Sequence, residues 1–533
     1  MKIQTIFISL LVTIIFILSI LLGTRVTLNN QQPSDLFQQS ITLPEAAKFV
    51  PKNSYLTIHF KINLNKIDNY IEPLTNKDKK SIAINNINEL RDGLFSLIGL
   101  DFKNDLSSWI GSDLSFSVFN AKESSDHKEW LLITQSINEQ NTKDFIDRFL
   151  RNQTNTGGDV KKINYKDQEI FSAVRPNSDS EDNEISMVLL EDDQLLISSN
   201  KEIIIEAIST SKDTSLNQLH DKELKELIST LEDGMALITA SPKALELLFK
   251  TPKEITTKLA NNSFVGSIRT KGKDISLNSI FNFKQPFIGV SNQSNQAIEM
   301  IKNIPISSKT IAIISEPKEI LQSSKANIYS QWLGPVVNNS LSTKDSNIKK
   351  AIFESSTEPL IYISQEDSWI IESTPDLDIS NIEEILKKNN YEMKKILTDN
   401  HELEVWYTIA LEEINDIYKI NPKVSLIVEK APNKIKWSNE ISNFENKLTF
   451  KKDNPIINTF PEIQNHSNLL THQIYLDQST TKKVLKNWKP WQLLKAISTK
   501  STDSHIQRLS LALGTYDDNQ ETLLNFQAQA SLN

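Results

Sequence analysis

Side chains that could carry out chemistry are few and widely spaced in this sequence. His466 and His472 are the closest histidine pair. They lie on a stretch expected to pass from loop to strand, so they do not share a helical face at the i, i+4 spacing of zinc-binding helices. We therefore expect no metal site here, and no cofactor.

Two acidic stretches could supply carboxylates. Asp376 and Asp378, in STPDLDIS, could form a pair, but a helix is predicted over Ser380 to Lys388, and acids just before a helix usually cap it. The run Asp179 to Glu184 (DSEDNE) lacks the glycine and the final glutamate of a calcium loop, which predicts a solvated loop.

The most unusual aromatic cluster is formed by Trp488, Pro490 and Trp491. Tryptophan is enriched in interfaces, but these residues precede a predicted helix, Gln492 to Ile497, and packing of that helix is the favoured interpretation. The chain contains no G-x-S-x-G, H-E-x-x-H, Walker A or G-x-G-x-x-G motif. Catalytic residues therefore stay unknown at this stage.

Composition excludes several classes of protein. The chain has no cysteine, so it has neither disulfides nor thiolate ligands. A formal net charge of −9 argues against a nucleic-acid partner, which requires clustered basic charge. Lysine doublets such as Lys349-Lys350 are scattered along the chain, and we expect them on solvated faces.

The long apolar element is N-terminal. Ile3 to Thr24 carries no charge and is long enough, at ~1.5 Å per residue, to cross a ~30 Å hydrocarbon core. A cleaved signal peptide is the alternative, but the apolar run is long and has no A-x-A-like cleavage site. We expect residues 1–24 to be an uncleaved signal anchor that inserts into the membrane through residues 3–24.

Charge around this segment favours a cytoplasmic N-terminus, because Lys2 and the α-amino group precede it and only Arg25 follows closely. The body would then lie on the periplasmic or thylakoid-lumenal side of the cell or thylakoid membrane. Residues 25–43 are polar and predict a flexible tether.

The remaining chain predicts an α+β fold with mainly antiparallel sheet, because paired strands and helices follow each other without a steady βαβ rhythm. We expect a first α+β repeat at 44–285, a linker at 286–304 and a second repeat at 305–533. The landmarks of the two halves occur in the same order over nearly equal lengths, which favours tandem duplication over two unrelated domains. The matched residues are Pro51 with Pro305, Trp109 with Trp332, Trp130 with Trp369, Ser186 with Ser425, and Phe283 with Phe526.

Two of these landmarks combine tryptophan with glycine. Gly111 and Gly334 are expected just past helices, as helix-stopping residues. Trp109 and Trp332 would then be core anchors on the last helical turns, rather than residues that stack on a ligand.

The stretch RDGLFSLIGLDFKNDLSSWIG, Arg91 to Gly111, and the opening LPEAAKFVPKNSYLTIHFKIN resemble an uncharacterised family of cyanobacterial membrane-anchored proteins, known as domain of unknown function 3352. The resemblance implies a cyanobacterial source and no known activity. It transfers no site residue to this chain.

Two classes of function stay open. The first is a non-catalytic binding or assembly module, tethered to the membrane, with a protein partner. The second is a membrane-tethered hydrolase whose carboxylates converge only in three dimensions. A lipid-binding cavity between the two repeats is a further alternative.

Overall fold

The structure is a computed structural model, and it describes the greater part of the folded body. The described residues are 40–61, 92, 95, 100–120, 128–174, 184–248, 251–271, 274–286, 308–322, 327–343, 345–375, 377, 380–397, 402–414, 417–432, 434–445, 470–487, 506–515 and 522–532. The predicted anchor and nearly all of the predicted tether and linker lie outside these ranges. Within them, no helix combines the length and apolarity needed to cross a membrane.

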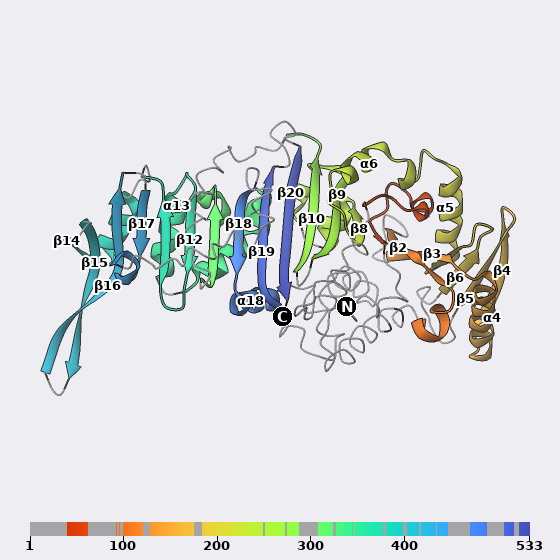
Figure 1. The fold of residues 1–533 in the computed structure, drawn as a ribbon, viewed down its shortest axis with the longest axis horizontal. Coiled ribbons are helices and arrows are strands. Elements are labelled where there is room, and N and C mark those ends of the chain that lie inside the picture. The colour runs from red at the N-terminus through yellow and green to blue at the C-terminus, as the bar shows by residue number, and fades with distance from the viewer. Residues whose placement is uncertain are drawn as a thin grey trace, which may run out of the picture. The chain divides into compact units, whose positions relative to one another are not determined.

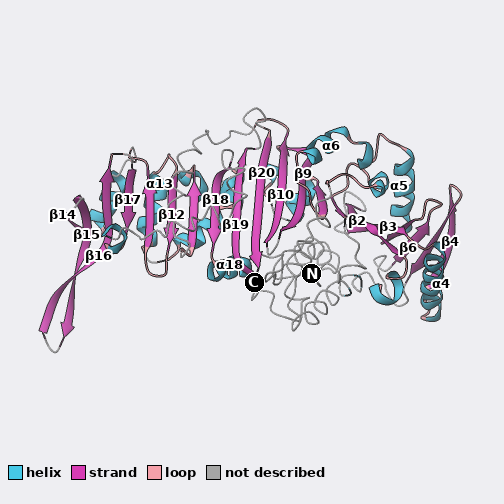
Figure 2. Cartoon of the chain, viewed as in Figure 1, coloured by secondary structure: helices cyan, strands magenta, loops and turns pink. Residues whose placement is uncertain are grey.

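The chain divides into two compact units. Unit 1 comprises Met1–Lys284, Lys486–Ile506 and Gln529–Asn533, and unit 2 comprises Gln285–Leu485 and Gln507–Ala528. Both units mix helices with strands, and the strand ladders are antiparallel (Figures 1 and 2). The predicted α+β class with mainly antiparallel sheet is therefore confirmed.

The described residues of unit 1 contain ten strands. Its elements are η2 (Glu45–Phe49), β1 (Leu56–Phe60), η5 (Phe102–Leu106), β2 (Ile110–Asn120), β3 (Lys128–Ser136), α4 (Glu139–Asn155), β4 (Asp159–Tyr165), β5 (Gln168–Val174), β6 (Glu184–Leu189), β7 (Gln194–Ser198), α5 (Lys201–Lys212), η7 (Gln218–His220), α6 (Lys222–Ser229), β8 (Ala236–Ala240), α7 (Pro242–Leu248), α8 (Lys253–Thr256), β9 (Leu259–Lys271) and β10 (Asp274–Phe283).

The strands of unit 1 form one antiparallel sheet in the order β10-β9-β8-β1-β2-β3-β7-β6-β5-β4. Helix α5 packs on β7, β6, β5 and β3, and it also contacts η2. Its start is fixed by Asn200, whose side-chain oxygen accepts a hydrogen bond from Ile203 N at 3.0 Å. The apolar side of α5 joins a buried cluster with Leu131, Val188 and Leu196 of the sheet.

Ten strands also occur in the part of unit 2 that the structure describes. Its elements are β11 (Thr310–Ile314), α10 (Pro317–Leu321), α11 (Ile328–Trp332), α12 (Gly334–Leu341), α13 (Ser346–Ser355), β12 (Leu360–Ser364), β13 (Trp369–Ser373), α14 (Ser380–Lys388), β14 (Glu392–Leu397), β15 (Glu402–Ile414), β16 (Ile417–Ala431), β17 (Lys434–Ser438), α15 (Ser442–Glu445), β18 (Leu470–Leu476), α18 (Gln478–Asn487), β19 (Ile506–Thr515) and β20 (Leu523–Leu532), the last two belonging to unit 2 through residues 507–528.

The strands of unit 2 pair in the order β20-β19-β18-β11-β12-β13-β17-β16-β15-β14. Adding ten to each strand number of unit 1 reproduces this order from end to end. The helices α4 and α14 also take the same place, each between the third and fourth strands of its unit.

Ladder register gives a residue-level comparison of the two sheets. Trp130 precedes Leu131, which pairs with Ser198 of β7, and Trp369 precedes Ile370, which pairs with Ser438 of β17. Trp130 and Trp369 therefore hold matching positions. On the next ladder Ser186 pairs with Ser198, whereas Ile427 pairs with Ser438. The residue that matches Ser186 is thus Ile427, two positions from the expected Ser425.

Candidate functional site

Trp109 lies in the core of unit 1. Its side chain has 0% exposure, and its ring centroid lies 5.3 Å from that of Phe145 in α4. Its indole Nε1 donates a hydrogen bond to the carbonyl oxygen of Asp105 at 2.6 Å. The expected burial of Trp109 is confirmed, although this residue lies between the short π-helical turn η5 and strand β2 rather than on an α-helix. Trp332, in unit 2, is half-buried, and its ring meets that of Phe526 edge to face at 5.2 Å.

Gly334 lies just past a helix as expected, because α11 ends at Trp332, but it begins the next helix, and Gly111 does not follow a helix at all. Gly111 lies inside β2, where an added Cβ would come within 2.8 Å of the Gln135 carbonyl oxygen on β3. Gly334 is the first residue of α12, where an added Cβ would come within 2.8 Å of the Ile320 carbonyl oxygen on α10. Both positions are glycine because another part of the backbone passes close by.

Several other residues singled out from the sequence lie outside the described ranges: His466, Asp376, Asp378, residues 179–183, Trp488, Pro490 and Trp491. Glu184, the last residue of the acidic run, begins β6 and accepts hydrogen bonds from Ser172 Oγ at 2.6 Å and Ser186 Oγ at 2.8 Å. It is part of the sheet rather than of a solvated loop. No group of three or more His, Cys, Asp or Glu side chains that could hold a metal occurs among the described residues.

The most unusual ionisable group is Lys349 on α13. The sequence predicts a solvated lysine, but its side chain has 0% exposure. Its Nζ donates to Thr343 Oγ1 at 2.5 Å and lies 5.8 Å from the centre of the Tyr362 ring. Burial lowers the pKa of Lys349 from 10.5 to about 8, and the nearby Asp345 carboxylate only partly opposes that shift.

The turn before α13 is held in an uncommon backbone conformation. Asp345 has φ of 60°, in the left-handed region that non-glycine residues seldom adopt. Its carboxylate accepts a hydrogen bond from Trp369 Nε1 at 3.2 Å. On strand β12, the hydroxyl of Tyr362 donates a hydrogen bond to the Ser340 carbonyl oxygen at 3.1 Å.

A lysine with a lowered pKa can serve as a base or a nucleophile. Here the amino group points at Thr343 and the Tyr362 ring, and the side chain has no exposed surface. The buried lysine therefore holds the segment that precedes α13 against strand β12. A sequence signal was present, because Lys349 lies four residues before the buried Phe353 on the same face of α13.

Each unit also buries one histidine completely. His59 on β1 shares a hydrogen bond with Ser115 Oγ at 2.7 Å, and burial, followed by the charge of Lys61, lowers its pKa to about 3. His472 on β18 accepts a hydrogen bond from Ser315 N at 3.2 Å, and burial lowers its pKa to about 3 as well. Both rings are therefore neutral near pH 7. We expected His472 in a loop-to-strand passage, and it lies inside the sheet of unit 2.

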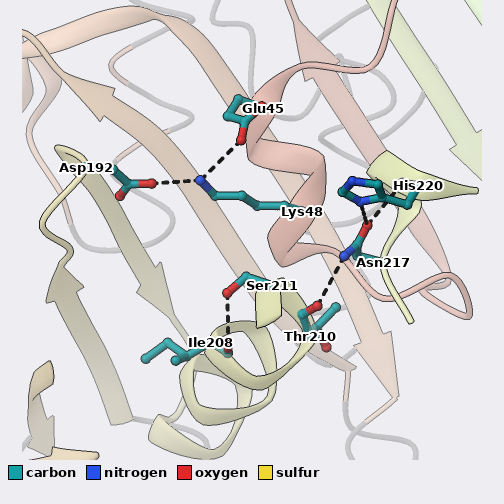
Figure 3. A network of polar contacts seen from close by, with 8 residues as sticks. All are labelled: Glu45, Lys48, Asp192, Ile208, Thr210, Ser211, Asn217 and His220. Carbon is teal, nitrogen blue, oxygen red and sulfur yellow. Dashed lines mark hydrogen bonds and ion pairs between the residues drawn. The ribbon is translucent and has the colours of Figure 1, made fainter. Parts of the chain in front are cut away.

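A third polar network joins η2 to the rest of unit 1 (Figure 3). Lys48 Nζ lies 2.7 Å from Asp192 Oδ2 and 3.3 Å from Glu45 Oε1. Burial opposes the charge of Lys48, but the bonds to Asp192 and Glu45 outweigh it and leave the lysine pKa raised. The ammonium group of Lys48 is paired with both carboxylates, which indicates that it holds η2 in place.

The other half of Figure 3 is centred on the buried Asn217. Its side-chain Nδ2 donates to the carbonyl oxygen of Thr210 at 3.3 Å, at the end of α5. Its Oδ1 accepts from His220 N at 3.1 Å and begins η7. Asn217 thus ties the end of one helix to the start of the next.

Two large apolar side chains are exposed on a hairpin arm, defined here as residues 407–424 of β15 and β16. The two strands pair from Tyr407↔Val424 to Ile414↔Ile417, with a bulge at Ser425 where the arm leaves the sheet. Figure 1 shows this ribbon projecting beyond the neighbouring strands of unit 2. Ile409 is 53% exposed and Ile420 is 70% exposed.

Taken together, the fold and these sites define an α+β protein with antiparallel sheets, buried and internally bonded ionisable groups, and a projecting apolar arm. The chain belongs to the family described as a protein of unknown function (DUF3352), whose family model matches residues 10–529. No curated protein and no solved structure matches the chain.

Proposed function

We propose that this protein is a non-catalytic binding or assembly module, anchored in a membrane by residues 3–24 and displaying its α+β body outside the cytoplasm. The observation that carries the proposal is the hairpin arm, whose large apolar side chains stand in solvent. Exposed apolar surface of this kind usually marks a site of interaction. The ionisable clusters, in contrast, are occupied by bonds within the fold.

We further propose that the body arose by tandem duplication of one α+β unit. The shared strand order of the two sheets supports this, as does the matching of Trp130 with Trp369. An ancestral unit of this size could bury its own core, and duplication would leave one copy free to acquire an extra feature such as the arm.

The test is affinity capture from the native cell of the full chain, tagged and solubilised in a mild detergent. We expect the wild type to retain a protein partner and the double variant Ile409→Lys, Ile420→Lys to lose it. The matched control is Ile137→Lys, Leu216→Lys, because these unit 1 residues are also exposed, at 66% and 52%. Equal capture by all three chains would refute the arm as the binding surface.

Membrane topology requires a separate test. Protease added to sealed, right-side-out membranes should digest the body if it lies outside the cytoplasm. Full protection of the body would contradict the proposed orientation.

A further inference from the structure

The amino group of Lys349 and the hydroxyl of Thr343 form a close pair in unit 2. Lys349 Nζ lies 2.5 Å from Thr343 Oγ1, and the lysine side chain has no exposed surface. Thr343, in contrast, is an exposed residue. The pair therefore joins a shielded amine to the hydroxyl of a surface residue, and an amine in that position can activate the hydroxyl as a nucleophile.

Three separate segments of unit 2 position this pair. Thr343 follows α12, Lys349 lies near the start of α13, and Tyr362 lies on β12. The centre of the Tyr362 ring is 5.8 Å from Lys349 Nζ, and the Tyr362 hydroxyl donates to the Ser340 carbonyl oxygen at 3.1 Å. The ring thus covers one side of the amine, and Thr343 Oγ1 is the hydrogen-bond partner of that amine.

The protonation state of Lys349 decides which of the two groups is the donor. A charged ammonium group has donors only, so it donates to Thr343 Oγ1. An uncharged amine has a lone pair and can accept the proton of the Thr343 hydroxyl. Burial lowers the pKa of Lys349 from 10.5 to about 8, opposed in part by Asp345, so the uncharged form is accessible in mildly alkaline solution.

The titratable groups that interact with Lys349, among the described residues, are Asp345 and Tyr362. Burial raises the pKa of Tyr362 to about 12, so its hydroxyl stays neutral near pH 8. The carboxylate of Asp345 accepts a hydrogen bond from Trp369 Nε1 at 3.2 Å. Lys349 is therefore the group placed to take the proton of the Thr343 hydroxyl.

The start of α13 lies close to Thr343 in the chain and supplies further hydrogen-bond donors. Asp345 is the residue before the helix, but its side chain does not cap α13. The first N–H groups of a helix have no partner within the helix, and this end carries a partial positive charge. Such donors stabilise the negative oxygen that forms when a hydroxyl attacks an acyl group. The arrangement therefore favours an acyl group as the reaction partner of Thr343.

We propose that Thr343 Oγ1 is a nucleophile that accepts an acyl group from an ester, with Lys349 as its base. The Oγ1–H bond breaks and its proton passes to Lys349 Nζ, while Oγ1 forms a bond to the acyl carbon. The bond from that carbon to the leaving alcohol oxygen then breaks, and Lys349 returns the proton to this oxygen. The protein becomes an O-acyl ester and the donor a free alcohol. A single transfer needs no turnover, so this inference goes beyond the proposed binding function without contradicting it.

Acetylation by p-nitrophenyl acetate tests this reaction on the full chain in mild detergent. Peptide mapping by mass spectrometry should find Thr343 acetylated roughly 100-fold faster than Thr257, because a positioned base contributes at least about that factor. Thr257 is the matched control, since it is also exposed and its hydroxyl donates to the Lys253 carbonyl oxygen at 2.8 Å. Hydroxylamine should remove the label, because it cleaves esters and leaves lysine amides intact. Acetylation of Thr343 no faster than that of Thr257 would overturn the inference.

Substitutions separate the nucleophile from the base. Thr343→Val should abolish labelling at this position, and Thr343→Ser should retain it. Lys349→Met should slow the acetylation of Thr343 to the rate of Thr257, with thermal unfolding used to verify that the variant is folded. A folded Lys349→Met chain that reacts as fast as the wild type would show that Lys349 is not the base.

The pH profile distinguishes a base from a merely structural lysine. In the wild type the rate of acetylation should rise about tenfold per pH unit below about pH 8 and level off above it, because only the uncharged amine accepts the proton. A rate that keeps rising without a plateau would contradict the role of Lys349. The capture experiment with the arm variants does not depend on this reaction, so either proposal can fail alone.

Discussion

Trp130 and Trp369 are held by the same contact in the two units. The backbone N–H of Trp130 donates to Ser199 Oγ at 3.0 Å, and that of Trp369 donates to Asn439 Oδ1 at 3.0 Å. Ser199 follows Ser198 and Asn439 follows Ser438, the residues that pair beside the two tryptophans. A polar side chain at the end of the seventh strand thus completes the ladder of the third strand in both units.

The contact in unit 2 can be tested by exchange between the units. Asn439→Ala should destabilise the fold by about 1–3 kcal/mol, because it leaves the buried N–H of Trp369 without its acceptor. Asn439→Ser introduces the residue type that unit 1 has at Ser199. This variant should lose less stability than Asn439→Ala, because its hydroxyl can still accept a hydrogen bond. Thermal unfolding of the two variants measures the difference. An Asn439→Ala chain that melts at the wild-type temperature would show that this acceptor contributes nothing to stability.

The sequence also predicts correctly that Trp109 is buried in the core of unit 1. Trp109→Ala should cost about 3–5 kcal/mol, since a buried aromatic side chain leaves a cavity beside Phe145. Trp109→Phe keeps an aromatic ring there and loses the bond to Asp105 and part of the buried volume, so its loss should be smaller. Denaturant unfolding of the full chain ranks the variants. A Trp109→Ala chain that unfolds like the wild type would contradict the core role.

Much of the fold could be predicted because local patterns decide it. The helix expected at Ser380 to Lys388 is α14 with the same bounds, and the antiparallel class follows from alternating strands. Lys349 shows where such reasoning fails, because a lysine reads as solvated until the neighbouring helices and β12 are in place. The apolar surface of the arm was missed for the converse reason: alternating residues at 407–424 look like an ordinary half-buried strand.

Gly334 shows that a position can require glycine for more than one physical reason. A helix-stopping glycine tolerates asparagine, whereas a glycine required by close approach tolerates no Cβ. Because the Ile320 carbonyl oxygen would lie 2.8 Å from that Cβ, we expect both Gly334→Ala and Gly334→Asn to destabilise unit 2 by about 1–3 kcal/mol. Chemical unfolding tests both. Tolerance of asparagine alone would restore the helix-stopping interpretation.

Lys349 should make the free energy of unfolding depend on pH in the alkaline range. Its folded pKa of about 8 lies below the 10.5 of the unfolded chain, so the unfolded state holds more protons between these values. The contribution of Lys349 to stability is therefore unfavourable below about pH 8 and improves as the pH rises toward 10.5. Lys349→Met should melt higher than the wild type at pH 7 and lack this alkaline gain. A lower melting temperature for Lys349→Met would show that the bond to Thr343 outweighs the burial of the amine.

The two buried histidines should make both units sensitive to acid. In the folded chain His59 and His472 have pKa values of about 3, against 6.5 when unfolded. Between these values the unfolded state binds more protons, so the stability from each neutral ring is fully present above about pH 6.5. It is lost as the pH falls toward 3, by roughly 1.4 kcal/mol for each histidine and pH unit.

His472→Asn provides the sharpest test of this pH dependence, because an amide oxygen can still accept the bond from Ser315 N and has no proton to gain. Its stability at pH 7 should drop through lost packing on Tyr329, whose ring lies 4.5 Å from that of His472. Between pH 6.5 and 4, however, its unfolding free energy should fall less steeply than that of the wild type. His220→Asn, which changes an exposed histidine of unit 1, is the control for the replacement of an imidazole by an amide. If His472→Asn loses stability in acid as steeply as the wild type, other groups dominate the acid unfolding of unit 2.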